Sequence, residues 1–153
     1  MIKHPHFLVL TLLFLSCEKD DICIEGSENT KRITIGFVNN KTRIQTGINL
    51  GYIKGINNDS IISEGFTGNY LKLPLMVNSN ETKYILEQNN IKDTLIIFHQ
   101  TDHLYLNRSC GFKANFLIQS DTKITKNSGW IREVSIEQDS IFNEEKTNIF
   151  IYY

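Results

Sequence analysis

Hydrophobic and polar residues alternate with a period of two along most of this 153-residue chain. Successive side chains of a β-strand point to opposite faces, so this alternation predicts half-buried strands. Residues 33–37, 71–75 and 110–118 show the pattern most clearly. No segment has the convincing amphipathic periodicity of a helix, so strands are the expected elements.

Turn-forming residues separate these runs at short, regular intervals. Clusters of Asn, Gly, Ser and Asp favour turns because these residues tolerate positive φ or bond their own backbone. Pro74 cannot donate to a sheet ladder and therefore marks an edge strand or a strand end. Further strands are expected over residues 49–53, 60–63, 82–88, 94–99, 130–138 and 147–153.

This strand pattern predicts an all-β fold. Strands about ten residues apart, with no helix-length segment between them, indicate an antiparallel β-sandwich of about seven to nine strands. An immunoglobulin-like or related topology is expected, with a small β-barrel as the alternative. Residues 30–153 are expected to form one such domain.

The first residues have the layout of a bacterial export signal. Lys3 precedes an apolar run over residues 7–15, and Ser16 and Cys17 follow. A helix of that length rises about 14 Å, whereas a membrane span needs about 20 residues. A small residue directly before a cysteine resembles a lipoprotein cleavage site. We therefore expect removal of residues 1–16 and lipidation of Cys17; the alternative is a secreted protein with a free thiol.

Cys23 and Cys110 are the two other cysteines. Cys23 lies between two isoleucines, and Cys110 shares a strand face with Phe112 and Phe116, so both thiols are expected to point inward. In an exported protein a disulfide between them is the natural pairing. The alternative is two buried free cysteines. Residues 17–29 would then be the lipidated cysteine and a tether.

Several stretches resemble an uncharacterised family of Bacteroidota lipoproteins, a domain of unknown function. They are CEKDDICIEG at residues 17–26, NRSCGFKANF at 107–116, GW at 129–130 before an alternating strand, and the aromatic end of the chain. The resemblance covers essentially the whole mature chain. It implies a lipoprotein with a β-rich domain, and it implies no catalytic residues.

Lys19, Asp20 and Asp21 follow directly after Cys17. They are similar to the lysine-plus-two-acids signal that sends lipoproteins of this phylum to the cell surface, an address that a receptor reads next to the acyl chains. A solvated linker is the alternative interpretation. The expected localisation is the outer membrane, lipid-anchored and facing the cell surface, with the periplasmic face as the alternative.

Composition and charge exclude some function classes. Hydrophobic residues make up 41% of the sequence and charged residues 22%, as in ordinary globular proteins. The formal net charge of −1 provides no basic field for nucleic acid. The expected partners are the membrane, through the lipid, and another envelope protein or a glycan, but no nucleic acid.

Few residues are candidates for chemistry. His99 and His103 would stand about 13 Å apart on one extended strand, too far to bind one metal ion. A turn over residues 100–102 would bring them together beside Asp102, but we expect two surface histidines beside a hairpin. No glycine-flanked nucleophile or phosphate loop is present, and Glu144 and Glu145 are typical of a solvated loop. We expect no catalytic residue, no metal site and no cofactor; a hydrolase or metal site is the alternative.

Three Asp residues are followed by a hydroxyl residue and then an aliphatic one. This pattern is similar to the acceptor motif for O-linked glycans on exported proteins of the same phylum, and it makes Ser60, Thr94 and Ser140 candidate sites. The same pattern also occurs where a turn leads into a strand. Both interpretations remain open from the sequence.

The leading functional hypothesis is a non-catalytic envelope protein that presents loops or a sheet edge to a partner. The alternatives are a structural or accessory subunit of an outer-membrane assembly and, third, an envelope enzyme. Trp130 and the terminal aromatic residues, including Tyr152, would make an aromatic binding face if exposed. Buried aromatics are the commoner outcome on alternating strands.

Overall fold

The computed structural model describes residues 23, 29–56, 60–125 and 129–153. These residues form strands β1 to β13 and no helix, which confirms the all-β class. The chain divides into two compact units. The hairpin-tip unit contains Cys23, Asn29 and Tyr105–Lys113, and the sandwich unit contains Thr30–Leu104 and Ala114–Tyr153.

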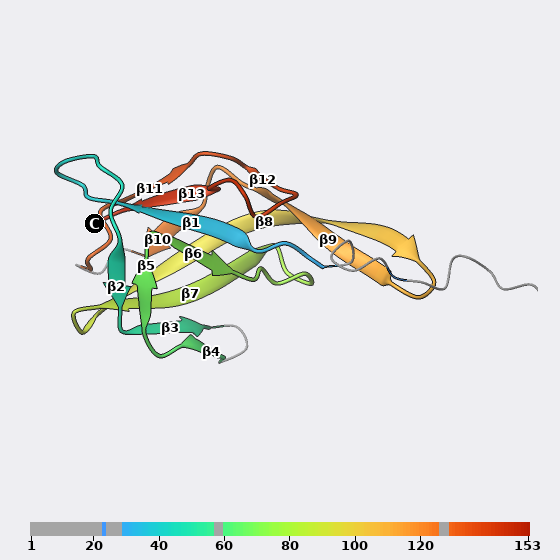
Figure 1. Ribbon diagram of the computed structural model, residues 1–153, viewed down its shortest axis with the longest axis horizontal. Helices are drawn as coiled ribbons and strands as arrows, with labels where there is room; N and C mark the ends of the chain where they lie inside the picture. Colours follow the sequence, from blue (N-terminus) through green and yellow to red (C-terminus); the bar gives the residue numbers. More distant parts are fainter. Residues whose placement is uncertain (1–22, 24–28, 57–59, 126–128) are drawn as a thin grey trace, which may run out of the picture. The chain divides into compact units, whose positions relative to one another are not determined.

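A four-stranded sheet forms one layer of the sandwich unit (Figure 1). Its strands, in order, are β11 (Glu133–Ile136), β13 (Ile149–Tyr152), β1 (Ile33–Val38) and β6 (Tyr70–Leu73). The β1–β13 pair is parallel, whereas the β1–β6 and β11–β13 pairs are antiparallel. The sheet is therefore mixed, in contrast to the antiparallel expectation, because the last strand returns to lie beside the first.

A larger sheet contains the long strands of the chain. In order it holds β12 (Ser140–Ile141), β9 (Gly111–Ile118), β8 (Ile91–Asn107), β7 (Glu81–Gln88), β3 (Tyr52–Gly55) and β4 (Ile61–Ser63), and β10 (Lys123–Thr125) also pairs with β8. A separate pair consists of β2 (Ile48–Leu50) and β5 (Phe66–Gly68). Within the described residues, each of the two larger sheets begins and ends on a different strand.

The turn between β7 and β8 explains their long, regular register. Asn89 and Asn90 both have positive φ, 49° and 64°. Two consecutive residues with positive φ give a hairpin turn whose twist matches that of the strands, and Asn tolerates this backbone better than most residues. The register then runs without a break from the Gln88–Ile91 pair to the Glu81–Phe98 pair.

The core consists of alternate side chains from the two larger sheets. Phe37 of β1, Leu86 of β7 and Phe116 of β9 are buried at 0–1% exposure. Fully burying a side chain of this kind stabilises the fold by about 1.5–3 kcal/mol. β1 is buried on both faces, and Asn148 exchanges hydrogen bonds of 2.8 and 2.9 Å with the backbone of its residue Thr34.

Several sequence expectations about strands need correction. The described residues contain more strands than the seven to nine expected, because residues 49–53 divide into β2 and β3 and because β5, β10 and β12 had no clear signal. Residues 100–102 continue β8 and form no turn, since β9 pairs alongside this strand. Pro74 directly follows β6, an end strand of its sheet, as expected.

Candidate functional site

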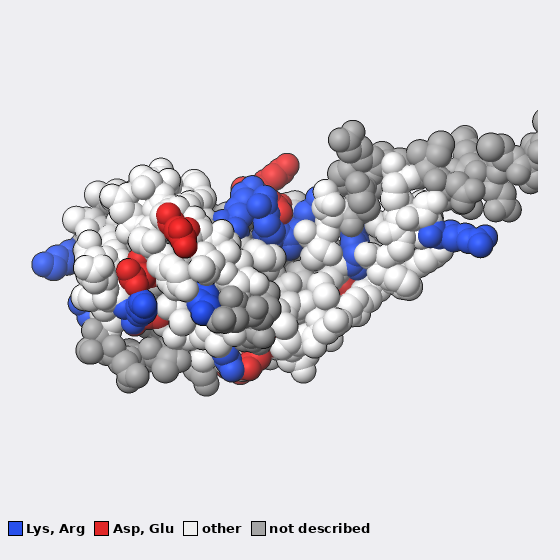
Figure 2. Space-filling view, turned by 90° about the horizontal axis from the view of Figure 1, so that it is seen from below, with Lys and Arg blue, Asp and Glu red and all other residues white. Residues whose placement is uncertain are grey.

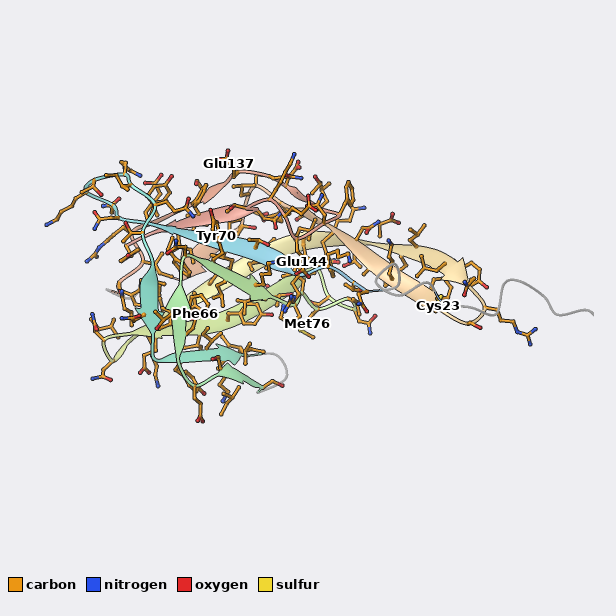
Figure 3. The ribbon with its side chains drawn as sticks, in the orientation of Figure 1. Cys23, Phe66, Tyr70, Met76, Glu137 and Glu144 are labelled. Carbon is orange, nitrogen blue, oxygen red and sulfur yellow. A yellow bond between two sulfur atoms is a disulfide. The ribbon has the colours of Figure 1, made fainter. Side chains whose placement is uncertain are left out.

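The cysteine pair of the hairpin-tip unit lies at disulfide distance. Cys23 and Cys110 form this bond across a sequence separation of 87, with their Cα atoms 5.4 Å apart (Figure 3). This distance agrees with the predicted pairing, but the predicted position of Cys110 is wrong. Cys110 lies half-buried in the turn between β8 and β9, where its N–H donates to Asn107 Oδ1 at 2.7 Å, and not on a core-facing strand.

Two aromatic side chains project from the same unit into solvent. Tyr105 is 55% exposed and Phe112 is 67% exposed, and their ring centroids lie 5.1 Å apart. The expectation that Phe112 points into the core is therefore wrong, although Ala114 and Phe116, further along β9, are buried. Alternation gives the direction of a side chain but does not reveal whether a second layer covers it.

The histidines do not form a joint site, and the expectation of two surface histidines is wrong for His99. His99 is fully buried, its Nε2 lies 2.9 Å from Thr82 Oγ1, and its ring packs edge-on against Phe116. Burial lowers the pKa of His99, which keeps the ring neutral at physiological pH. Asp102 and His103 are exposed. Within the described residues, no group of three or more His, Cys, Asp or Glu side chains is arranged to bind a metal ion.

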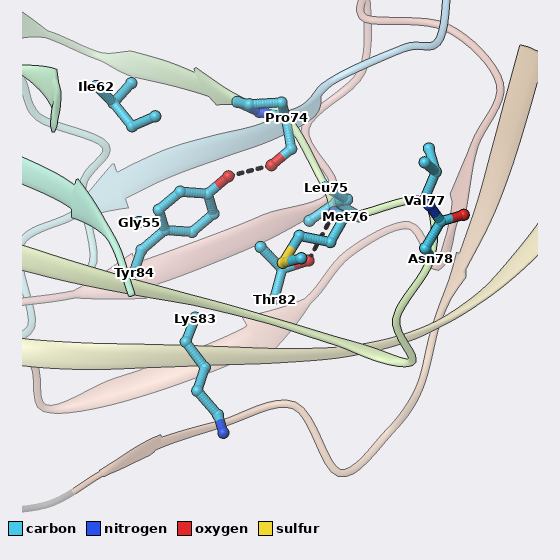
Figure 4. A pocket seen from close by; sticks show the side chains of 10 residues that line it. All are labelled: Gly55, Ile62, Pro74, Leu75, Met76, Val77, Asn78, Thr82, Lys83 and Tyr84. Carbon is cyan, nitrogen blue, oxygen red and sulfur yellow. Dashed lines mark hydrogen bonds between the residues drawn. The ribbon is translucent and has the colours of Figure 1, made fainter. Parts of the chain in front are cut away.

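A groove of about 290 Å³ lies beside the end strand β4, and we call it the β4 groove (Figure 4). The Tyr84 hydroxyl donates to the Pro74 carbonyl, and burial raises the pKa of Tyr84. The Met76 N–H donates to Thr82 Oγ1 at 2.9 Å. Strands β3, β4 and β7 and the segment after β6 line the groove. The lining residues are Gly55, Ile62, Pro74, Leu75, Met76, Val77, Asn78, Thr82, Lys83 and Tyr84.

The β4 groove offers mainly apolar contact. The Tyr84 and Thr82 hydroxyls already have partners within the protein, and the Lys83 side chain points away from the groove (Figure 4). At the rim, Ile61 is 54% exposed and Ile62 is 39% exposed. β4 ends the strand order of its sheet, and such a strand presents unpaired backbone groups to a further strand.

A second, polar cleft of about 300 Å³ lies on the outer face of β1 and β6, and its lining includes Lys72. Tyr70 and Glu144, which also line it, are labelled in Figure 3. Arg32 donates to Glu144 through Nε at 3.1 Å, Nη2 at 2.9 Å and its backbone N–H at 3.0 Å. Lys72 Nζ lies 3.3 Å from the same carboxylate.

These cations decide the ionisation of the cleft carboxylate. The hydrogen bonds from Arg32 lower the pKa of Glu144 to about 2, with Lys72 contributing in the same direction. A carboxyl group with so low a pKa is a poor general acid or base at neutral pH. Glu144 is therefore an anchored structural carboxylate and not the solvated loop residue that we expected; its neighbour Glu145 is exposed.

The terminal aromatics do not make a binding face around Trp130. Trp130 is 6% exposed, and its Nε1 donates to the Leu86 carbonyl at 3.2 Å. Tyr152 is half-buried, with the Arg43 guanidinium 4.6 Å from its ring centroid. Trp130 is therefore a buried aromatic residue, the commoner outcome on alternating strands.

The candidate glycosylation residues Ser60, Thr94 and Ser140 are all half-buried. Thr94 lies within β8, in register with Ile85 and Thr125. The Ser140 hydroxyl accepts a 3.3 Å bond from the Gln138 amide. Modification stays a prediction, and a mass explained by lipid and polypeptide alone would contradict it. Residues 1–16, Cys17, Lys19, Asp20 and Asp21 lie outside the described residues.

The comparisons with known proteins assign a family. Residues 51–153 match DUF6452, a family of unknown function. The chain belongs to DUF6452. The match contains the β4 groove and Cys110, whereas Cys23 precedes it. No curated protein and no solved structure matches the chain.

Two surface properties complete the description of this DUF6452 chain. Basic and acidic side chains are interspersed over the face shown in Figure 2, so that face carries no broad field of one sign. Within the part of the chain that the structure describes, no helix has the length and apolar character needed to cross a membrane.

Proposed function

We propose that this DUF6452 protein is a lipid-anchored cell-envelope protein whose sandwich unit is a non-catalytic binding module. The observation that carries the anchoring is the pairing of Cys23 with Cys110. The sequence has three cysteines, so this bond leaves Cys17 without a cysteine partner in its own chain. A cysteine at the end of an apolar export signal is the residue that lipoprotein processing acylates.

The β4 groove supports the binding role. The Tyr84 and Thr82 hydroxyls that line it already have partners within the protein, and most of its other lining side chains are apolar. An extended apolar segment of another envelope protein fits this arrangement, because it can pair with the backbone of β4 while one of its side chains enters the groove. Main-chain bonds would give affinity, and the groove would select the side chain.

Photo-crosslinking in native membranes tests this binding role. A photoreactive residue replaces Val77, which lines the groove, and in a control it replaces Ile44, which is 64% exposed elsewhere. We expect a discrete protein adduct from position 77 that is lost in Ile62→Asp. Equal adducts from both positions, or an adduct unaffected by Ile62→Asp, would contradict the groove as the binding site.

A glycan is the second candidate ligand, favoured by the polar cleft. Tyr70 is 49% exposed and can stack on a sugar face, while the carboxylates of Glu144 and Glu145 accept hydrogen bonds from sugar hydroxyls. In this case Tyr70→Ala would abolish retention on immobilised envelope polysaccharide, whereas Ile62→Asp would leave it unchanged. The opposite result would favour the protein ligand.

The tether residues Lys19, Asp20 and Asp21 support display on the cell surface, with the periplasmic face of the outer membrane as the alternative. Protease treatment of intact cells, with a periplasmic marker as control, distinguishes the two. We expect digestion of the protein in intact cells and protection after all three residues are replaced by Ala. Digestion after lysis alone would place the domain in the periplasm, where a structural role in an outer-membrane assembly is the alternative function.

A further inference from the structure

The last residues of β8 and the first residues of β9, on either side of their turn, carry an exposed aromatic pair that the proposed binding role does not use. Tyr105 and Phe112 contact one another and expose more than half of their surface. Arg108, between them in sequence, is also exposed. A phenolic ring, an apolar ring and a guanidinium are the side chains that settle at a lipid–water boundary, where rings reach the acyl region and cations meet phosphates.

The disulfide places this turn close to the predicted lipid. Cys23 follows Cys17 by six residues, and a fully extended chain of that length spans about 20 Å. Cys23 is bonded to Cys110, which lies between Arg108 and Phe112. The acyl chains on Cys17 would therefore hold the turn within about 20 Å of the membrane surface, less than the thickness of a bilayer.

Tethering makes a weak contact sufficient. A short linker turns membrane contact into an intramolecular event with an effective concentration in the millimolar range. Two aromatic rings alone would not keep a soluble protein on a bilayer. When the lipid on Cys17 already holds the protein on the membrane, the two rings need only to orient the domain.

We propose that the hairpin tip, made of Tyr105, Arg108 and Phe112, docks on the phospholipid surface into which Cys17 is anchored, and that the Cys23–Cys110 disulfide holds it there. This inference rests on the proposed lipid anchor. The disulfide then has a second role beyond stabilisation: it shortens the free tether from residues 17–29 to residues 17–23.

Fluorescence of a Phe112→Trp variant tests the contact. The full chain is purified from membranes and reconstituted into phosphatidylethanolamine–phosphatidylglycerol vesicles that contain brominated acyl chains. Trp130 is the single tryptophan of the sequence and is buried, so the unsubstituted protein provides the baseline. We expect the added emission to be blue-shifted and quenched by the bromine. In the control variant Ile44→Trp, at an exposed position of the sandwich unit, the added emission should be neither blue-shifted nor quenched.

Vesicle flotation separates failure of the anchor from failure of the docking. If the protein does not float, the lipid anchor is wrong and the proposed function fails with it. If it floats but Phe112→Trp stays unquenched, or if Ile44→Trp is quenched equally, the docking alone is overturned. The double variant Cys23→Ser, Cys110→Ser in the Phe112→Trp background should lose most of the quenching; unchanged quenching would overturn the role of the disulfide. The same double variant without Phe112→Trp, in which Trp130 is the single tryptophan, reports by its emission that the fold is intact.

Discussion

The two ends of β9 have the same alternation of residues but opposite environments. Phe116, in the sandwich unit, is 1% exposed, whereas Phe112, in the hairpin-tip unit, is 67% exposed. Both side chains occupy even-numbered positions of one strand. Phe116 packs against His99 of the neighbouring strand, and Phe112 contacts Tyr105.

Phenylalanine therefore has a structural role at one end of β9 and is available for contacts at the other. The sandwich end is stabilised by burial of apolar surface. At the tip end, a disulfide joins Cys110 to Cys23, and the rings of Tyr105 and Phe112 are exposed. Substitutions at the two ends should therefore differ in stability and in membrane behaviour.

The largest contrast should come from the two phenylalanines. Phe116→Ala removes a fully buried ring and should lower the free energy of unfolding by about 3–5 kcal/mol. Phe112→Ala, at the exposed end of the same strand, should change it by less than about 0.5 kcal/mol. Urea denaturation of both variants measures the difference. Equal losses would mean that the tip is packed as tightly as the sandwich.

Opening the disulfide should have the next largest effect. The bond closes a sequence separation of 87, and crosslinks of this kind stabilise proteins by about 2–4 kcal/mol, mainly by restricting the unfolded chain. We expect Cys23→Ser to lower the urea midpoint while β-sheet circular dichroism is retained. Loss of the sheet signal in water would show that the sandwich unit depends on the bond for folding.

Two aspartates of β8, one buried and one exposed, should show the same contrast in stability with a smaller difference. Asp93 is 5% exposed, and its Oδ2 accepts the Ile131 N–H at 2.7 Å, whereas Asp102 is exposed. Asp93→Ala leaves that buried N–H without a partner and should cost about 1–3 kcal/mol. Asp102→Ala should be nearly neutral. Thermal unfolding of the pair tests this, and a greater loss for Asp102→Ala would reverse the assignment.

The smallest effect should depend on pH. The pKa of Glu144 is held near 2, below its ordinary value of 4.5, so the unfolded state binds the proton first as the pH falls. The stabilisation is therefore present above about pH 4.5 and is lost toward pH 2. Because Arg32 is partly exposed, we expect only about 1 kcal/mol.

Two neighbouring variants isolate this titration. Glu144→Gln should be less stable than the unsubstituted protein at neutral pH, and the gap should close as the pH falls toward 2. Glu145→Gln is the matched control, because its exposed side chain lies outside the Arg32 contact. A gap that persists in acid would assign the effect to packing and not to charge.

Local patterns in the sequence account for most of the sandwich. Alternation located β1, β7 and the buried part of β9, and the two asparagines after residue 88 marked a turn. Pro74 marked the end of β6 because proline lacks an N–H for the ladder. These features depend on neighbouring residues, so the sequence carries them directly.

Features that depend on distant partners were not predictable. The expected strand over residues 94–99 stops before the polar residues 100–102, yet these residues continue β8, which pairs with β9. The pairing of β13 with β1 and the contact of Arg32 with Glu144, 112 residues apart, have no local signature. Exposure of Phe112 likewise depends on a covering layer that alternation does not encode.

Non-reducing peptide mass mapping of the protein extracted from its native membrane tests the different roles that we propose for the three cysteines. We expect an N-terminal peptide that begins at an acylated Cys17 and a separate pair of peptides joined through Cys23 and Cys110. A peptide beginning upstream of Cys17, an unacylated Cys17 or a disulfide that includes Cys17 would contradict it.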